Sequence, residues 1–148
     1  MEYRDANYDD YESFIALAEK THKQSIYKNL NFSEKKAFTR FASFLENKNR
    51  YFCKVAVCND KVVGVLFGKL VKPDYSDDFI ACDVFFWVER SIRKQGIGLA
   101  LIELFLGWAL AGRAKHIQLQ NGAGIIGDLS GLFKKAGLVK TGELYGTK

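Results

Sequence analysis

The sequence predicts one α/β domain in which helices cover both faces of a mixed, mostly antiparallel sheet. Its 148 residues are enough for a single domain with a substantial core, and we take residues 1–148 as one unit. Helical and strand-like patterns follow one another in the approximate order β-α-α-β-β-β-α-β-α-β. Hairpin-forming strands come first and a β-α-β unit follows, and this order is typical of a mixed sheet.

Two helices are expected after a weak strand at EYRDA. Asn7 with Asp10 three residues later resembles a capping box, and the apolar spacing behind it predicts a helix over 8–20. Ser33 is expected to cap a second helix, whose apolar face would hold Ala37, Phe38, Phe41, Phe44 and Leu45. The segment between them, THKQSIYKNLNF, has no period and predicts an ordered loop or short helical turns.

The middle of the chain predicts three strands. RYFCKVAVC and KVVGVLFGKLV are rich in β-branched and aromatic residues, and Asn59-Asp60 between them predicts a tight hairpin turn. KPDYSDD is expected to form a turn, and FIACDVFFWVE predicts the third strand.

The last third is expected to add two helices and two strands. An apolar helix over 98–111 would end at Gly112, and because it is apolar nearly all round it should be buried against the sheet. HIQLQ predicts a short strand, NGAGIIGD a glycine-rich loop, and LSGLFKKA a short helix that Gly137 ends. LVKTGELYG predicts a final strand.

Composition excludes several classes of protein. The net charge of +5 suits anionic ligands, but the cations are scattered and predict no nucleic-acid surface. Cys53, Cys58 and Cys82 lie in apolar runs without zinc spacing, so we expect no metal, buried thiols and a reducing compartment. The polar start resembles no signal peptide, and the longest apolar run is shorter than the roughly 20 residues that a membrane span needs. We therefore expect a cytoplasmic protein without a membrane contact.

The motif RKQGIG (93–98) lies where a predicted strand passes into a predicted helix. Gly96 and Gly98 would expose backbone amides at the start of the helix, where the macrodipole favours an anion, and Arg93 and Lys94 add charge. A pyrophosphate would fit there. Glycine at such a turn can also be turn chemistry alone, and the residues leave both interpretations open. The motif matches neither the dinucleotide pattern nor a Walker loop.

Together with its context, this motif resembles the signature Arg/Gln-x-x-Gly-x-Gly/Ala of the GCN5-related N-acetyltransferases, the GNAT superfamily. LFKKAGLVKTGELY is similar to the closing segment of that family, and the predicted element order is also the family's. His22, Ser25, Tyr27 and Phe32 form an H-x-x-S-x-Y…F pattern that resembles a bacterial and phage-borne subgroup.

The resemblance implies acetyl-CoA as co-substrate. The amides of residues 95–99 would hold the pyrophosphate, the fourth strand would pair with the pantetheine arm, and an N–H near Val88 would stabilise the oxyanion of a tetrahedral intermediate. The coenzyme-binding residues implied are Phe86, Trp87, Val88, Arg93, Lys94, Gln95, Gly96, Ile97, Gly98, Leu99 and Phe133.

Catalysis by direct transfer to an amine needs a base and a proton for the thiolate. Asp83 matches the position where many family members carry an acidic base, although it could equally be a solvent-facing carboxylate. Glu89 is a second candidate, for which helix capping or pairing with Arg93 is the favoured interpretation. The family's tyrosine acid is replaced by Phe133, which leaves Tyr145, Tyr27 or water as the source of the proton.

The acceptor is expected to be a primary amine of a small molecule or a protein. His22, Tyr27 and Phe32 lie in the loop that would form its pocket, with simple packing as the alternative role, and NGAGIIGD is a second candidate wall. The resemblance also allows a homodimer. The favoured function is an acetyl-CoA-dependent N-acetyltransferase. Because Phe133 replaces the usual acid, an acetyl-CoA-binding sensor without turnover is the alternative.

Overall fold

The computed structural model describes residues 1–120 and 129–147. Its elements in chain order are β1 (Glu2–Asp5), the 3-10 helix η1 (Tyr8–Asp10), α1 (Tyr11–Lys23), α2 (Glu34–Glu46), β2 (Tyr51–Cys58), β3 (Lys61–Val71), β4 (Ile80–Val88), the 3-10 helix η2 (Arg90–Ile92), α3 (Ile97–Ala111), β5 (His116–Gln118) and α4 (Ser130–Lys135).

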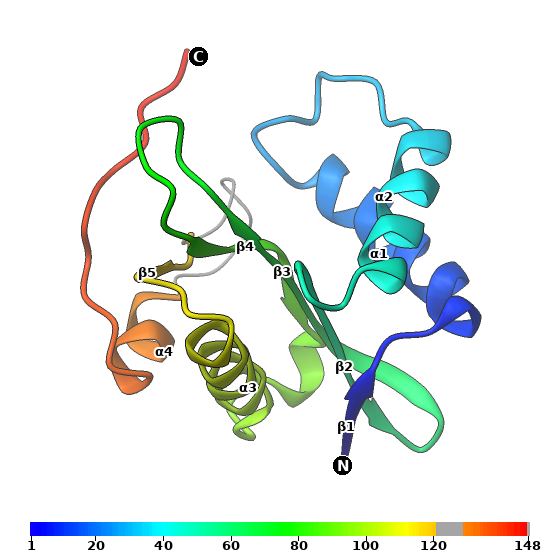
Figure 1. Cartoon of the computed structure of the whole chain (residues 1–148). Helices are drawn as coiled ribbons and strands as arrows, with labels where there is room; N and C mark the ends of the chain where they lie inside the picture. Colours follow the sequence, from blue (N-terminus) through cyan, green and yellow to red (C-terminus); the bar gives the residue numbers. More distant parts are fainter. Residues whose placement is uncertain (121–128, 148) are drawn as a thin grey trace.

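The five strands form one sheet in the order β1-β2-β3-β4-β5. The first four are antiparallel neighbours, and β5 adds in parallel beside β4. Figure 1 shows α1 and α2 on one side of this sheet and α3 and α4 on the other. The mixed, mostly antiparallel sheet with helices on both faces is therefore confirmed.

The sheet separates two hydrophobic cores. Alternation along β2 sends Ala56 to the core beneath α3 and sends Val55 and Val57 to the core beneath α1 and α2. The second core is strongly aromatic, and the rings of Phe14 and Phe41 stack with centroids 4.9 Å apart. Burial on both faces explains why the middle strands are almost continuously apolar.

The N-terminal helices form largely as expected. Asn7 and Asp10 make the predicted capping box, but it starts the 3-10 helix η1, and α1 then runs on to Lys23 rather than ending at residue 20. Ser33 caps α2, as predicted, by accepting the N–H of Lys36 at 3.2 Å. Asn59 and Asp60 both have positive φ, which fits the expected hairpin turn.

Two glycines of β3 let α3 lie close to the sheet. A Cβ on Gly68 would be 2.4 Å from the Phe105 ring, and a Cβ on Gly64 would be 3.1 Å from Ile97. The prediction that α3 is buried is correct for this face only. Leu104 and Leu110 on the opposite face are 40% and 66% exposed.

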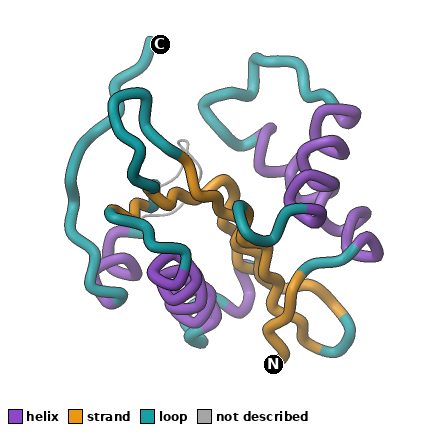
Figure 2. The backbone as a smooth tube through the Cα atoms, viewed as in Figure 1, coloured by secondary structure: helices purple, strands orange, loops and turns teal. Residues whose placement is uncertain are grey.

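The predicted final strand is wrong. Residues 138–147 form neither helix nor strand, and Figure 2 shows them as a continuous loop along the molecule. Gly137 ends α4 with φ of 86°, as expected. The expected loop NGAGIIGD lies outside the described residues. No helix of the described part is both long and apolar enough to span a membrane.

Candidate active site

The site centres on a place where β4 loses its parallel neighbour. Strand β5 pairs with β4 at only three positions, the last of which joins Cys82 to Gln118. Phe85 and Asp83 pair with the adjacent residues Phe67 and Gly68 of β3, so Val84 is an extra residue that forms a bulge. Beyond Asp83, no strand in the described part of the chain pairs with the β5-side edge of β4.

Peptide groups of β4 point to this open edge at alternate residues. The N–H of Glu89 donates to Val63 of β3 at 2.8 Å, whereas Val88, one residue earlier, is the partner of Gly64. In an antiparallel ladder the groups of successive residues point to opposite sides. The N–H groups of Val88 and Phe86 therefore point away from β3, and that of Trp87 points toward it. The edge can accept an extended ligand as a further strand would.

The chain after β4 is held by two side chains. The Glu89 carboxylate accepts the N–H of Arg90 at 3.1 Å and caps η2, so the expected capping role is observed. Arg93 Nε donates to the Val88 carbonyl at 2.9 Å. This second contact, which no sequence pattern signals, fixes the end of β4 relative to the loop that follows.

The loop then presents free amides at the start of α3. Lys94 and Gly96 have φ of 73° and 84°, and Gly96 is the N-cap of the helix. Within the described residues, none of the N–H groups of residues 94–99 donates to a protein oxygen. Free amides and the positive end of the helix dipole favour an anion at this position.

Gly96 and Gly98 serve different purposes. A Cβ on Gly96 would meet no atom within 4 Å, so the space above it is open. A Cβ on Gly98 would be 3.0 Å from Leu132 of α4 and 3.3 Å from Phe86. Close packing against α4 and β4 therefore explains the glycine at position 98. The glycine at position 96 is explained by its left-handed backbone, and the space beside it is open. Gln95 is exposed beside it, the Ile97 side chain is buried, and Leu99 is half-buried.

Asp83 lies at the point where β4 and β5 separate. Its Oδ1 accepts the N–H of Gln120, just after β5, at 3.1 Å. Asp83 pairs with Gly68 of β3, and a side chain on Gly68 would face Phe105 of α3. Because directly paired residues share a face of the sheet, the side chain of Asp83 leaves the sheet on the α3 face. Burial raises the pKa of this half-buried carboxyl to about 6, and the N–H from Gln120 partly opposes that rise. A group with this pKa can exchange protons near neutral pH.

Phe133 and Tyr145, the two residues considered in connection with the proton donor, differ in their surroundings. Phe133 is a half-buried residue of α4 that packs against the core beneath α3. Tyr145 is 85% exposed in the C-terminal segment, and its hydroxyl donates to Glu143 at 2.6 Å. The acidic partner raises the pKa of Tyr145. The Tyr145 hydroxyl is thus already bonded to a carboxylate of its own segment.

The H-x-x-S-x-Y…F pattern organises the loop between α1 and α2. His22 Nε2 lies 2.6 Å from the Leu30 carbonyl, and its ring packs against Phe32 with centroids 5.5 Å apart. Ser25 is buried, donates to the His22 carbonyl and accepts the N–H of Tyr27. Three of the four residues therefore close the loop, and Tyr27 remains 46% exposed.

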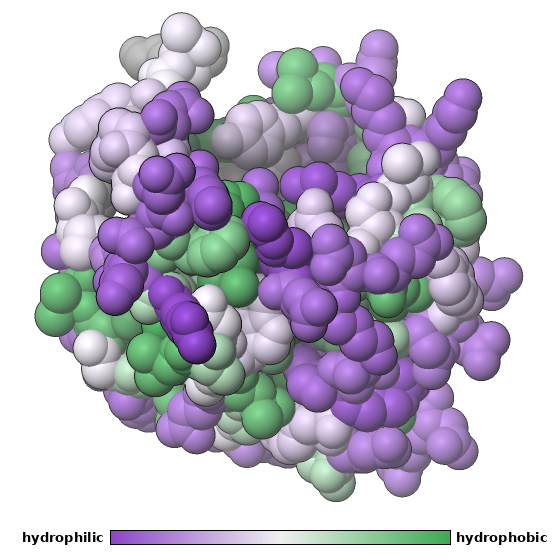
Figure 3. Space-filling model, viewed as in Figure 1, coloured by the Kyte–Doolittle hydropathy of each residue, from purple (hydrophilic) through white to green (hydrophobic). Residues whose placement is uncertain are grey.

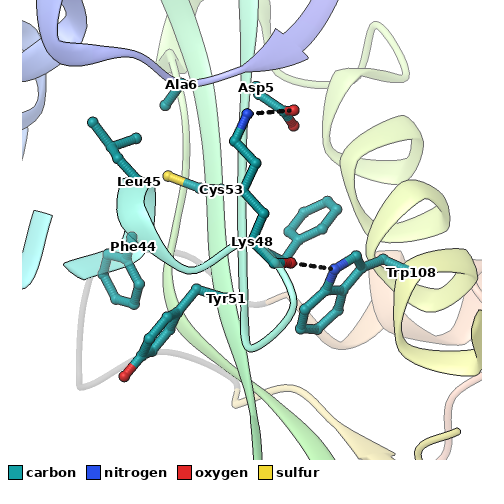
Figure 4. Close-up of a pocket in the computed structure, with 9 residues that line it drawn as sticks. Asp5, Ala6, Phe44, Leu45, Lys48, Tyr51, Cys53 and Trp108 are labelled. Carbon is teal, nitrogen blue, oxygen red and sulfur yellow. Dashed lines mark hydrogen bonds and ion pairs between the residues drawn. The ribbon is translucent and has the colours of Figure 1, made fainter. Parts of the chain in front are cut away.

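A small, partly open cavity of about 50 Å³ lies elsewhere, between β1, α2, β2 and α3. Figure 4 shows Lys48 spanning it toward Asp5, and its carbonyl accepts the indole N–H of Trp108 at 3.4 Å. Cys53 lines this cavity, and burial raises the pKa of its thiol, which makes it a poor nucleophile. The described residues contain no cluster of three or more side chains suited to hold a metal ion.

Solved structures share this fold over nearly the whole chain. A transcriptional regulator from Bacillus halodurans C-125 is 20% identical with a TM-score of 0.76, and 99% of this chain matches 98% of that one. An aminoglycoside antibiotic 6′-N-acetyltransferase from Acinetobacter haemolyticus is 15% identical with a TM-score of 0.73, covering 100% and 98% of the two chains. Glucosamine-6-phosphate N-acetyltransferase from Arabidopsis thaliana is 10% identical with a TM-score of 0.71, covering 99% and 97%. At these identities the likeness concerns the fold.

The sequence itself settles the family. No curated protein matches the chain significantly. The model of the Acetyltransferase (GNAT) family matches residues 8–124, which include the open edge of β4 and the loop that follows it. Because this match covers most of the chain, the protein belongs to the GNAT family of acetyltransferases.

Proposed function

We propose that this protein transfers the acetyl group of acetyl-CoA directly to a primary amine of a small molecule or a protein. The observation that carries the proposal is the open edge of β4, which is followed, after η2, by the free amides at the start of α3. Membership of the acetyltransferase family supports the type of reaction. Two solved acetyltransferases of similar fold are named for an aminoglycoside and for glucosamine-6-phosphate as acceptor, which supports an amine as acceptor.

The coenzyme would lie along β4 and end at the loop. The N–H group of Val88 would pair with its pantetheine arm, and the amides of 95–99 would bind its pyrophosphate. Arg93 and Lys94 add positive charge, and the open space at Gly96 supports close approach of a phosphate. The bound thioester supplies the activated acetyl group. The N–H of Phe86, which also points to the open edge and lies farther from the loop, would then stabilise the oxyanion, a contact typically worth about 3 kcal/mol.

Proton transfer is assigned to Asp83 and to water. Asp83 lies where the two strands separate, and its pKa of about 6 supports a carboxylate that is ionised at neutral pH and can accept the amine's proton. Glu89 is a weaker candidate because its carboxylate caps η2. Phe133 has no proton to give, and the Tyr145 hydroxyl is bonded to Glu143, so we propose water as the donor to the thiolate.

The acceptor would approach from the α1–α2 loop. His22 and Phe32 support this loop, and the exposed Tyr27 is the member of the pattern that can contact an acceptor. We place the reaction in the cytoplasm, since all three cysteines are free thiols.

The test is release of free thiol from acetyl-CoA across a panel of primary amines, with coenzyme-induced thermal stabilisation measured in parallel. The proposal expects stabilisation by the coenzyme together with thiol release for at least one amine. Stabilisation without thiol release across a broad panel would favour the sensor alternative. No stabilisation at all would overturn the proposed coenzyme site.

A further inference from the structure

Three cations and one aromatic ring form a row at the end of the sheet opposite the RKQGIG loop. Arg50 directly precedes β2, Lys72 directly follows β3, Phe79 directly precedes β4 and Lys115 directly precedes β5. Strand β4 has 9 residues, and at about 3.3 Å per residue it keeps Phe79 roughly 30 Å from the loop that follows it. We call Arg50, Lys72, Phe79 and Lys115 the basic row. Its cations are scattered along the sequence, and only the sheet brings them together.

The four side chains of the basic row lie on the α3 face of the sheet. Backbone pairing includes these residues, because the N–H of Leu70 donates to the Arg50 carbonyl and that of Lys115 donates to the Phe79 carbonyl, both at 2.8 Å. Side chains two positions apart on a strand share a face. Each member of the row is two positions from a residue of the core beneath α3, namely Phe52, Leu70, Ala81 and Ile117 in the same order.

The Phe79 ring holds two of the cations in place. Its half-buried ring packs against the core beneath α3, so its own position is fixed. The Arg50 guanidinium lies 4.7 Å from the ring centroid, and the Lys72 ammonium lies 5.2 Å from it. Because both lie over one ring, they are no further apart than about 10 Å, the Debye length at 0.1 M salt, and salt does not fully screen their repulsion. An anion bound between them would relieve it.

Carboxylates do not balance these charges in the described part of the chain. Arg50, Lys72 and Lys115 are exposed, and none of them forms an ion pair with a described residue. The turn between β3 and β4 carries three exposed carboxylates, and these form no ion pair with the row either. They belong to Asp74, Asp77 and Asp78.

Helix α3 accounts for only part of the positive charge. Its C-terminal end lies beside the row, since a Cβ on Gly112 would be 2.7 Å from the Leu70 side chain. Figure 3 shows hydrophilic side chains around the apolar ones over this helix. The end of a helix dipole is equivalent to about half a negative charge, which cannot balance three full positive charges.

We propose that the basic row binds a phosphate group, at a site separate from the one proposed for the coenzyme. A guanidinium that lies over a ring keeps its N–H groups at its edge, so Arg50 can donate to two phosphate oxygens. Lys72 supplies a point charge from β3, and Lys115 supplies a third cation from the side of β5. The proposal does not depend on acetyl transfer.

Titration of the whole chain with inorganic phosphate and, separately, with glycerol 3-phosphate tests the site. Two-dimensional NMR of the backbone amides and the arginine side chains follows the binding, with sodium chloride keeping the ionic strength constant. Saturable shifts are expected at the basic row, with a Kd on the order of 1 mM or lower. The amides of 95–99 report separately on phosphate that binds at the proposed coenzyme loop.

Substitutions distinguish a built site from a general effect of net charge. Arg50→Gln and Lys72→Gln should each weaken phosphate binding at the row by about fivefold or more. Phe79→Leu keeps every charge but removes the ring that positions two of them, and it should weaken binding by about threefold. The matched control is Lys61→Gln, which removes the same charge at the opposite end of β3 and should leave the Kd unchanged.

The cations of the row and Lys61 are exposed, so their glutamine variants should keep the circular dichroism spectrum of the wild type. The proposal is overturned if neither phosphate probe causes saturable shifts at the basic row, or if the shifts are confined to 95–99. It is also overturned if Lys61→Gln weakens binding as much as Lys72→Gln, because net charge alone would then explain the result.

Discussion

Gly96 and Gly137 offer a matched pair of substitutions at the residue scale. Both have φ near 85° and both have open space where a side chain would stand. Valine at either position therefore costs mainly the strain of the left-handed backbone, about 1–2 kcal/mol. Gly96→Val should also abolish coenzyme-induced thermal stabilisation, because its side chain would fill the space proposed for a phosphate.

The control is Gly137→Val, which should lower the melting temperature by a similar amount and keep the stabilisation by acetyl-CoA. Thermal shift with and without the coenzyme distinguishes the two variants. If Gly96→Val is stabilised as strongly as the wild type, the amides of 95–99 do not bind the pyrophosphate.

Asp83 makes stability depend on pH in a defined direction. Its pKa rises from the ordinary 3.8 to about 6 on folding, so between these values the folded state binds more protons than the unfolded one. The free energy of unfolding should therefore fall as pH rises from about 4 to about 6 and stay lower above it. Asp83→Asn keeps an acceptor for the Gln120 N–H and removes this penalty. At pH 8 it should be more stable than the wild type by at most about 3 kcal/mol, reduced by solvent near the half-buried group.

Equal stability of the two proteins at pH 8 would contradict the raised pKa. A separate measurement tests the proposed role of Asp83 as base. The wild-type rate with a good acceptor should rise with pH through about 6, and Asp83→Asn should lose activity by about 10²-fold or more. An unchanged kcat in this variant would leave Asp83 with only its bond to Gln120.

Individual residues show what the sequence could and could not reveal. Asn7 and Ser33 were predictable because capping depends on neighbours within three residues. The contact of Arg93 with the Val88 carbonyl depends on how the loop folds back, and no spacing encodes it. The sequence does not signal the bulge at Val84 either, since the bulge follows from pairing with β3 and not from local composition.

At the scale of elements, α3 lies on β3 because two glycines leave room for it. Gly68→Val should destabilise the protein by about 3 kcal/mol or more, because its side chain would occupy the space of the buried Phe105 ring. Gly131→Ala is the control. It adds a methyl group to α4 in open space, and alanine favours a helix by about 1 kcal/mol, so its effect should be neutral or slightly stabilising.

Chemical denaturation of both variants measures this difference. A loss of less than about 1 kcal/mol for Gly68→Val would mean that α3 can move away from the sheet at little cost. The strand pattern of the sequence gives no reason for these glycines, since the side chains that explain them lie on a helix about 35 residues further along.

The incorrect expectation of a final strand has a plain physical cause. LVKTGELYG has residues that favour a strand, but a strand forms only against a partner, and residues 138–147 have none in the described chain. Helix α3 was expected to be buried against the sheet, and its inner side is, while Leu104 and Leu110 on its outer side remain exposed. Composition that is apolar nearly all round does not say which side of the helix the sheet covers.

For the whole molecule, the fold class was predictable because it depends on the order of elements, which hydrophobic patterns reveal well. The position of the candidate site was suggested only by the resemblance of the RKQGIG motif, and its role stays a prediction. Its geometry could not be predicted. The open edge exists because β5 is three residues long and leaves β4 after Cys82, a property of the assembled sheet.

The two cores should unfold together, because they share the same strands. On β2, Ala56 belongs to the core beneath α3, while its neighbours Val55 and Val57 belong to the other core, and neither face can lose its packing without disturbing the sheet. Phe41 and Phe105 are fully buried on opposite faces, so each change to alanine should cost about 3–5 kcal/mol. Both should shift one common transition, seen identically by circular dichroism and by tryptophan fluorescence.

Phe38→Ala is the control for this prediction, since a ring that is 46% exposed should contribute about 1 kcal/mol or less. Two separate transitions, with Phe41→Ala lowering only one of them, would show that the α1–α2 layer unfolds independently of the sheet. A single transition has a functional consequence. Coenzyme bound along β4 would then stabilise the α1–α2 layer too, because the sheet that is proposed to hold the coenzyme forms one wall of both cores. Hydrogen exchange with and without acetyl-CoA should accordingly show slower exchange in α2 as well as in α3.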